Sequence, residues 1–350
     1  MNQGTVRTLL TIEPTPQAPR NSEGSLIALR DGTLYLAYSR FTGGTADNAR
    51  AEIARRISHD GGQSWSDDAI IIPTEGAENV MSVSLLRLPS GQILLFYAVK
   101  NGWDDCKLYL RRASEDMETL GERICATPHD GYHVVNNDRV VQLRSGRLVV
   151  PAAYHPSTGN SREAWSARSV AMCFLSDDEG HTWRQGRDAL EAPPESRSGL
   201  QEPGVVELAD GRLYMWTRTD LGCQYESFSV DGGDTWSAAR PSPMASPLSP
   251  ASIKRVPWNG ALLLVWNDHS GRHPFPPGRR TPLCAALSHD EARTWQPSRV
   301  IEPDPDGWYC YTSITFVDDG VILGYCAGDS VVGRLNRLKL TKLDRTWLTG

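Results

Sequence analysis

Residues able to do chemistry recur at one register of this sequence. Six short turns hold a glycine, at positions 32, 91, 146, 211, 260 and 320. The residues nine positions before these glycines are Glu23, Ser82, Asn137, Glu202, Ala251 and Tyr311. Carboxylates can exchange protons with a substrate. A phenol that passes its proton to a base can attack a substrate as a nucleophile. If the six turns are equivalent in the fold, two carboxylates and a phenol face one shared space.

The six glycines belong to six expected hairpins. Each consists of an apolar run, a two-residue turn of Asp-Gly, Ser-Gly or Asn-Gly, and a second apolar run, which is the strongest short-range signal for a hairpin. The segments are LIALRDGTLYLAY, LLRLPSGQILLFYA, VVQLRSGRLVVPAA, VVELADGRLYMWTR, IKRVPWNGALLLVW and ITFVDDGVILGYC. The near-continuous apolar runs predict sheets that are buried on both faces.

A second repeat alternates with the hairpins. Its copies are SHDGGQSW (58–65), SDDEGHTW (176–183), SVDGGDTW (229–236) and SHDEARTW (288–295), where Ala292 replaces the usual glycine. Degraded copies are SEDMETL from Ser114 and TKLDRTW at 341–347. In this turn the Asp can accept hydrogen bonds from turn amides, and the Trp can wedge between neighbouring elements.

Six hairpins alternating with six boxes predict an all-β fold, a six-bladed β-propeller that occupies residues 1–350 as one domain. The box starts are 53 to 62 residues apart, enough for about four short strands each. The segment VRTLLTI near the N-terminus is expected to add a strand to the last blade and close the ring. The inner strand of each blade then begins near the axis, where the six register residues meet.

The repeated box resembles the Asp-box, or BNR repeat, of the sialidase (neuraminidase) superfamily, and the similarity to bacterial exo-α-sialidases covers essentially the whole chain. The resemblance implies that Tyr311 is a nucleophile and Glu202 its base. A sialic acid carries a carboxylate on the anomeric carbon, so an anionic nucleophile would be repelled, whereas a neutral phenol relayed to a glutamate avoids this. Sialidases are known to depart in this way from the usual pair of carboxylates.

The resemblance also implies a general acid and a set of arginines. Asp47, on a glycine-rich loop after the first hairpin, matches the acid, and desolvation is expected to raise its pKa. Arginines bind a substrate carboxylate in a bidentate way. Arg218 and Arg280 match two members of the family's triad, with Arg279 as a register alternative to Arg280, and Arg40 matches a further family arginine.

The chain departs from the family pattern where the first inner strand begins. Sialidases place the first triad arginine there, but this chain has APRNSEG, with Glu23 at the register position and Arg20 a few residues earlier. A glutamate would repel a substrate carboxylate unless it is protonated or paired. Three interpretations stay open: Arg20 reaches the site, two arginines suffice, or Glu23 binds the hydroxyls of a different sugar.

Further candidate residues come from the third blade and from two loops. In blade three, Asn137 is a candidate substrate-binding residue, and His133, Asp138, Arg139 and His155 either face the pocket or form structural hydrogen bonds. The long loop 267–280 and Trp103 are candidate parts of a rim that stacks on sugar faces.

Composition excludes several classes of partner. The net charge is −6, without a basic cluster, which argues against nucleic acid, and no membrane span is expected. The seven cysteines are widely spaced, so neither a disulfide framework nor a zinc site is expected, and no metal or organic cofactor is implied. The N-terminus lacks a recognisable leader, which favours a cytoplasmic protein, or a secreted or periplasmic one if a leader was removed.

These observations predict a retaining exo-glycoside hydrolase of sialidase type that removes a terminal sialic acid or a related acidic sugar from a glycan. One alternative is a glycosidase or lyase of the same fold acting on a uronic, ulosonic or neutral sugar. The other is a propeller that binds glycans without catalysis, because Asp-boxes occur in such proteins as well. The oligomeric state does not follow from the sequence.

Overall fold

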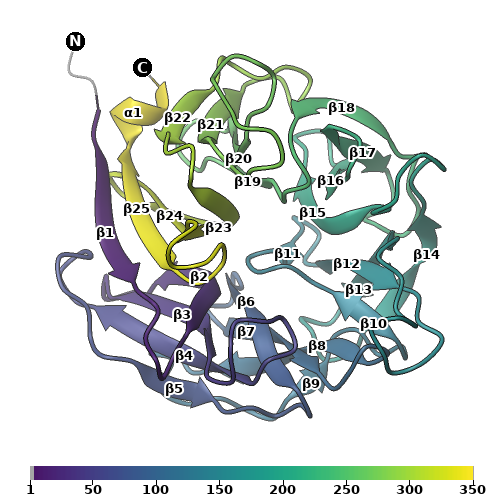
Figure 1. Ribbon diagram of the computed structural model, residues 1–350, viewed down its shortest axis with the longest axis horizontal. Coiled ribbons are helices and arrows are strands. Elements are labelled where there is room, and N and C mark those ends of the chain that lie inside the picture. The colour runs from purple at the N-terminus through teal and green to yellow at the C-terminus, as the bar shows by residue number, and fades with distance from the viewer. Residues whose placement is uncertain (1–3, 350) are drawn as a thin grey trace.

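Six groups of antiparallel strands are arranged around a central axis in the computed structural model, which describes residues 4–349. Figure 1 shows the groups following one another around the ring, with the first and last strands side by side. The predicted six-bladed β-propeller is therefore confirmed. In five of the hairpins the turn glycine has a positive φ, for example Gly32 at 86° and Gly211 at 88°. In the sixth hairpin the turn is 318–319, and the expected turn glycine Gly320 is instead the first residue of the strand Gly320–Gly328.

The first three blades contain these strands. Blade one consists of β2 (Arg20–Ala28), β3 (Leu34–Phe41), β4 (Ala51–Ser58) and β5 (Ala69–Ile72). Blade two consists of β6 (Asn79–Arg87), β7 (Ile93–Lys100), β8 (Cys106–Ala113) and β9 (Ile124–Cys125). Blade three consists of β11 (Val141–Gln142), β12 (Leu148–His155), β13 (Val170–Ser176) and β14 (Arg184–Leu190). An additional strand, β10 (Tyr132–Val134), pairs with both β8 and β12 and joins blades two and three.

The last three blades follow the same plan. Blade four consists of β15 (Gln201–Glu207), β16 (Leu213–Arg218), β17 (Cys223–Ser229) and β18 (Arg240–Ala245). Blade five consists of β19 (Ser252–Arg255), β20 (Leu262–Asn267), β21 (Leu283–Ser288) and β22 (Arg299–Glu302). Blade six consists of β23 (Trp308–Val317), β24 (Gly320–Gly328), β25 (Leu338–Asp344) and β1 (Val6–Ile12), and the short helix α1 (Arg345–Thr349) follows β25.

The ring closes through its two ends, as the sequence predicts. Strand β1 pairs antiparallel with β25, with Ile12 opposite Leu338 and Val6 opposite Leu343. The N-terminal segment thus becomes the outermost strand of the last blade. Hydrogen bonds between β1 and β25 therefore hold the two ends of the chain together. Closure leaves no break between the first blade and the last.

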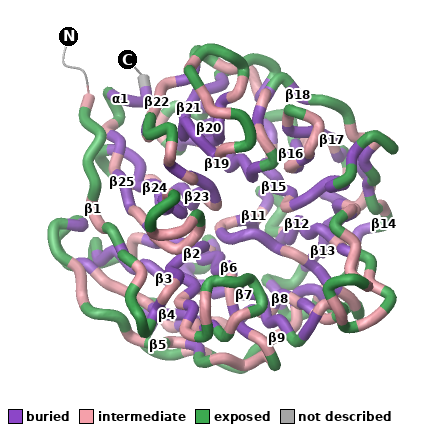
Figure 2. Tube along the Cα trace, viewed as in Figure 1, coloured by how far each residue is buried: buried purple, intermediate pink, exposed green. Residues whose placement is uncertain are grey.

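The hydrophobic core lies between neighbouring blades. Figure 2 shows buried residues along the inner strands and exposed ones in the outer turns. Strands β7, β20 and β24 are buried along their whole length, which explains why both hairpin arms are apolar in the sequence. Five interfaces between blades also receive a box tryptophan: Trp65, Trp183, Trp236, Trp295 and Trp347.

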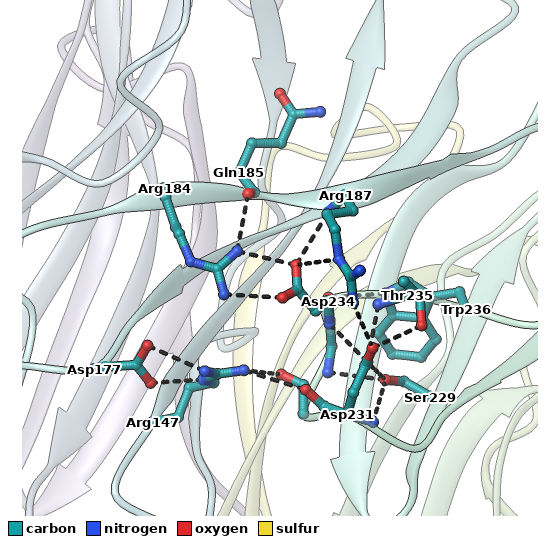
Figure 3. A network of polar contacts seen from close by, with 12 residues as sticks. Arg147, Asp177, Arg184, Gln185, Arg187, Ser229, Asp231, Asp234, Thr235 and Trp236 are labelled. Carbon is teal, nitrogen blue, oxygen red and sulfur yellow. Dashed lines mark hydrogen bonds and ion pairs between the residues drawn. The ribbon is translucent and has the colours of Figure 1, made fainter.

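The box turns are held by hydrogen bonds to their aspartates, as the sequence predicts. In the box 229–236, Asp231 accepts bonds from the Thr235 amide (2.9 Å), the Thr235 hydroxyl (2.7 Å) and the Ser229 hydroxyl (2.9 Å). Although burial raises the pKa of Asp231, these bonds lower it to about 2. Figure 3 shows the same box fastened to blade three, where Arg184 and Arg187 of β14 contact Asp234. The boxes are scaffold on the outer side of the ring.

Candidate active site

Backbone bulges in four inner strands aim side chains at the axis. At each bulge two residues lie opposite one residue of the neighbouring strand, because the register shifts there. The first residue of each pair has a left-handed φ: Glu23 (42°), Ser82 (59°), Glu202 (46°) and Tyr311 (59°). Bulges bend a strand and re-aim a side chain, and they are common beside active sites. All four side chains line a central cavity of about 280 Å³.

Blades three and five deviate from this register. In blade three the left-handed residue is Asp138 (φ 56°), one position later than the count predicts. Asn137 does not line the central cavity, and its side-chain nitrogen donates to the main-chain carbonyls of Gly24 (2.7 Å) and Tyr311 (3.0 Å). The structure therefore places Asn137 as a tie between inner strands, in place of the predicted contact with substrate. Ala251, at the register position in blade five, is fully buried and offers no polar group.

Tyr311 and Glu202 lie together and share a third partner. The Tyr311 hydroxyl donates to Glu202 Oε1 at 3.0 Å, and Arg218 Nη1 donates to Glu202 Oε2 at 2.6 Å. The three residues come from β23, β15 and β16 and all line the cavity. A carboxylate that accepts from a phenol can take the proton of that phenol, which is the arrangement of a nucleophile beside its base.

The charges around this pair hold the two groups in complementary protonation states. Burial would raise the pKa of Glu202, but Arg218 and Arg280, together with the bonds from Arg218 and Tyr311, hold it below its ordinary value. Burial and the neighbouring Glu202 raise the pKa of Tyr311, against the opposing charges of Arg280 and Arg218. Glu202 is thus an anion and Tyr311 a neutral phenol.

Arg280 is buried beside Tyr311, at the end of the loop 267–280. Its guanidinium carbon lies 5.6 Å from the centre of the Tyr311 ring, and its Nε and Nη1 atoms have no hydrogen-bond partner. Arg279, the register alternative, contacts Asp306 at 3.3 Å instead. Among the described residues, none at 267–280 lines the central cavity, so this loop does not form the expected rim, and Arg280 reaches the site only through its contact with the Tyr311 ring.

Arg20 connects Glu23 to Asp47. Its Nη2 donates to Glu23 Oε1 at 2.7 Å and its Nη1 donates to Asp47 Oδ1 at 2.5 Å. The Arg20 side chain is 1% exposed, whereas that of Asp47 is 67% exposed. Both acids line the cavity, but Arg20 does not. Arg20 thus balances the negative charge of Glu23, which stands where the family pattern has an arginine. It also forms an ion pair with Asp47 on the loop after β3.

The pKa of Asp47 differs from the expectation drawn from the sequence. Desolvation would raise that pKa, but the charge and hydrogen bond of Arg20, with smaller contributions from Lys100 and Arg280, hold it below the ordinary range. The expected upward shift is therefore wrong. The opposite applies to Glu23, where burial raises the pKa despite the opposing charge of Arg20.

Arg40 lies outside the cavity. Its guanidinium contacts Glu52 at 2.6 Å and Asp68 at 3.4 Å, between strand β4 and the loop before β5. The expected substrate contact of Arg40 is therefore replaced by a structural one, because this side chain points toward the outer strands of its own blade. Its neighbour along the strand, Phe41, instead packs under the guanidinium of Arg20 at 4.2 Å.

Blades two and three supply an aromatic and cationic wall that sequence reasoning largely missed. It consists of Lys100, Trp103, Tyr132, His155, Arg162 and Trp165, all of which line the cavity. The His155 ring stacks on Trp165 at 4.5 Å, and burial lowers the pKa of His155 to about 4, so that this imidazole is neutral. Lys100 is 1% exposed, and its Nζ lies over the rings of Trp103 (4.6 Å) and Tyr132 (5.3 Å).

A simple signal would have found part of this wall. Lys100, His155 and Arg218 end the second strand of their blades and Arg40 is the last residue but one of its strand, all seven to nine residues after the turn glycine. The same count from the turn glycine in blade two leads to Lys100. Trp165 and Arg162 lie in the irregular segment between β12 and β13, where no period of the sequence leads to them.

Within residues 4–349, no group of three or more His, Cys, Asp or Glu side chains could hold a metal ion. No helix in the same range is long and apolar enough to cross a membrane.

Comparisons with known proteins agree with this architecture. A family model described as "BNR repeat-like domain" matches residues 32–323. A sialidase from Micromonospora viridifaciens is 26% identical over 330 residues, which cover 85% of this chain and 48% of that protein. An anhydrosialidase from Macrobdella decora is 34% identical over 94 residues, or 27% of this chain and 10% of that protein. The chain thus spans less than half the length of these relatives.

Solved structures show the same fold. A protein of unknown function from Dyadobacter fermentans superposes with a TM-score of 0.74 at 17% identity, covering 97% of this chain and 99% of its own. The leech intramolecular trans-sialidase superposes with a TM-score of 0.73 at 16% identity, covering 99% of this chain and 71% of its own. With the family match spanning most of the propeller, the chain belongs to the BNR repeat-like family and is an Asp-box protein of the sialidase superfamily.

Proposed function

We propose that this protein is a retaining exo-glycoside hydrolase that removes a terminal sialic acid or a related acidic sugar from a glycan. The observation that carries the proposal is the hydrogen bond from the Tyr311 hydroxyl to Glu202 Oε1, with Arg218 on the other carboxylate oxygen. A hydroxyl nucleophile beside an ionised base is the arrangement that covalent catalysis requires. The sialidase relatives support the same reaction class.

In the proposed first step, the Tyr311 oxygen attacks the anomeric carbon while its proton passes to Glu202. The bond to the leaving oxygen breaks, and Asp47 protonates that oxygen. In the second step Asp47 accepts a proton from water, the water oxygen attacks the anomeric carbon, and Glu202 returns its proton to the departing Tyr311. Two displacements at the same carbon retain the anomeric configuration.

Asp47 must leave Arg20 to act as the acid. The ion pair with Arg20 holds Asp47 as an anion, but the Asp47 side chain is 67% exposed on the loop between β3 and β4. Buried Asn79 donates to the carbonyls of Asp47 and Ala49, both at 2.9 Å, which keeps the main chain of this loop near the cavity while the carboxylate stays free to turn. Once its contact with Arg20 is lost, the pKa of Asp47 rises toward the range of a general acid.

We assign the substrate carboxylate to Arg218, which lines the cavity, and to Arg280, which lies beside the Tyr311 ring without lining the cavity. Arg20 is committed to Glu23 and Asp47, whereas Arg218 Nε and the Nε and Nη1 atoms of Arg280 have no partner. Of the three interpretations that the sequence leaves open, this geometry favours two arginines. The aromatic wall around Trp103 and Trp165 offers ring faces on which a sugar can pack.

One observation favours a second candidate function. Glu23 lines the cavity, and its carboxylate accepts from Arg20 and Ser22 in the position where the family carries an arginine. A carboxylate there can bind sugar hydroxyls, which suits a sialidase-fold glycosidase with a different sugar. A panel of aryl glycosides of sialic, ulosonic, uronic and neutral sugars separates the candidates.

The decisive experiment is turnover of an aryl sialoside by the wild type, Tyr311→Phe and Glu202→Gln. We expect wild-type turnover with retention, and a loss of about 10²–10⁴-fold in Glu202→Gln. Full activity in Tyr311→Phe contradicts the mechanism. Turnover of another glycoside, with none of the sialoside, favours the second candidate, and no turnover of any glycoside favours a binding protein.

A further inference from the structure

His155 lines the central cavity with one ring nitrogen already bonded. Its Nδ1 lies 2.9 Å from the main-chain carbonyl of Ser166. A carbonyl oxygen only accepts hydrogen bonds, so we assign the ring proton to Nδ1, which makes Nε2 an acceptor. Burial lowers the pKa of His155 to about 4, and the imidazole therefore stays in this neutral form.

Gln201 presents a second acceptor in the same way. Its Nε2 donates to the main-chain carbonyl of Ala167 at 2.9 Å, which turns the amide oxygen Oε1 away from that carbonyl. Within residues 4–349, neither Gln201 Oε1 nor His155 Nε2 has a hydrogen-bond partner. Both residues line the cavity, and neither of the two atoms is fully buried. The cavity thus offers a ligand two atoms that accept hydrogen bonds and cannot donate them.

One segment holds both acceptors in place. The two carbonyls that orient them belong to consecutive residues between β12 and β13. Trp165 of the same segment stacks on the His155 ring at 4.5 Å. Arg168 of this segment donates to the carbonyl of Ala192 at 2.7 Å, which ties the segment to the loop between β14 and β15. Groups that are held before a ligand arrives lose little freedom when they bind it.

The two acceptors lie beside residues that the proposed reaction uses. Gln201 directly precedes Glu202 in β15, and it lies opposite Arg218 of β16. Glu202 and Arg218 also act electrostatically on His155. A sugar whose carboxylate is bound by Arg218 therefore extends toward both acceptors.

Two fixed acceptors select a group that brings two hydrogen-bond donors. Hydroxyls on neighbouring carbon atoms are such a group, and a sialic acid carries them at the end of its exocyclic three-carbon chain. A group that offers only acceptors would leave both protein atoms unpaired, which costs affinity.

We propose that His155 Nε2 and Gln201 Oε1 bind neighbouring hydroxyls of the exocyclic chain of the substrate. The two residues then determine specificity for acidic sugars whose polyhydroxylated chain is intact. This inference rests on the proposed function, because the acidic sugar and the place of its carboxylate come from it.

Binding of an unreactive sugar tests the inference without turnover. The probe is 2-deoxy-2,3-dehydro-N-acetylneuraminic acid, which has no glycosidic bond to break. Periodate followed by borohydride removes the last two carbons of its chain together with their hydroxyls. In calorimetry with the full chain, we expect the shortened compound to bind about tenfold more weakly than the intact one, because two hydrogen bonds are lost.

Two variants remove one acceptor each. His155→Phe keeps a ring on Trp165 without the acceptor, and Gln201→Met keeps the length of the side chain without its amide. In either variant the intact compound should bind about fivefold more weakly than in the wild type, whereas the shortened compound should bind as before. A thermal melt shows which variants are folded, and one folded variant of the two suffices for the test.

His133→Phe is the matched control. His133 is buried on β10, which pairs with the strand that carries His155, and burial lowers its pKa to about 4 as well. It does not line the cavity. This variant should therefore keep the wild-type preference for the intact chain.

The inference is overturned if neither compound binds the folded wild type, if both bind equally, or if the folded variants at His155 and Gln201 keep the full preference. Failure of the proposed function has a different signature. Chain-dependent binding without turnover of any glycoside supports the inference and rejects the hydrolase. Turnover of sialosides without a preference for the intact chain rejects the inference alone.

Discussion

Replacing Arg20 by methionine tests the unusual charge arrangement at the start of β2. The change keeps much of the aliphatic volume but leaves Glu23 buried without its cation. Breaking a buried pair by removing one partner costs about 3–5 kcal/mol of unfolding free energy, because the remaining charge is uncompensated. Both side chains of this pair are at most 3% exposed, so the full range applies. The exposed Asp47 adds little to this cost.

The loss should depend on pH and on Glu23. Burial already raises the pKa of Glu23 in the folded protein, and removal of Arg20 raises it further, because Arg20 is the largest opposing cause. A group whose folded pKa lies above its unfolded value favours folding below the unfolded value, and this contribution is lost as pH rises through the folded pKa. Arg20→Met should therefore be closest to the wild type in stability near pH 4.5 and fall behind as the pH increases.

The assay is urea unfolding of the wild type, Arg20→Met and Arg20→Met/Glu23→Gln at several pH values between 4.5 and 8. We expect the double variant to regain most of the lost stability at pH 8, because it no longer buries an anion. The reasoning is refuted if Arg20→Met is as stable as the wild type at pH 8, or if the second substitution makes the protein still less stable.

Three further predictions concern the proposed acid Asp47, the box tryptophan Trp236 and the buried hydroxyl of Tyr35. Asp47→Asn should slow cleavage of a natural sialoside by about 10²–10⁴-fold but slow a nitrophenyl sialoside much less, because a good leaving group needs no acid. Equal slowing of both substrates in steady-state assays contradicts the role of Asp47 as the general acid. Trp236→Ala should lower the free energy of unfolding in urea by about 3–5 kcal/mol, since the Trp236 side chain is 9% exposed between blades three and four. A loss below about 1 kcal/mol contradicts the packing role of this ring between the two blades. Tyr35→Phe should unfold at the same urea concentration as the wild type or a higher one, because its hydroxyl has no partner to lose; a clear destabilisation reveals a bond that the structure lacks.

Local patterns in the sequence were sufficient to predict the architecture. Turn glycines and the box aspartates act within a few residues of themselves, so their period counts blades without reference to the fold. The same period found Glu23, Glu202 and Tyr311, because in blades one, two, four and six a bulge at a constant distance from the turn points the same register position inward. It failed by one residue at Asn137, where the inner strand of blade three is reduced to Val141–Gln142.

Tertiary structure decided which charges pair and which side chains reach the cavity. Arg20 and Asp47 are 27 positions apart, and only the fold brings them to 2.5 Å and reverses the expected direction of the Asp47 pKa. Arg40 and Arg218 have similar places in their blades, yet one contacts outer-strand acids and the other contacts Glu202. Local patterns repeat because every blade forms the same kind of strands and turns. An ion pair depends instead on which side chains the neighbouring blades and loops place beside it.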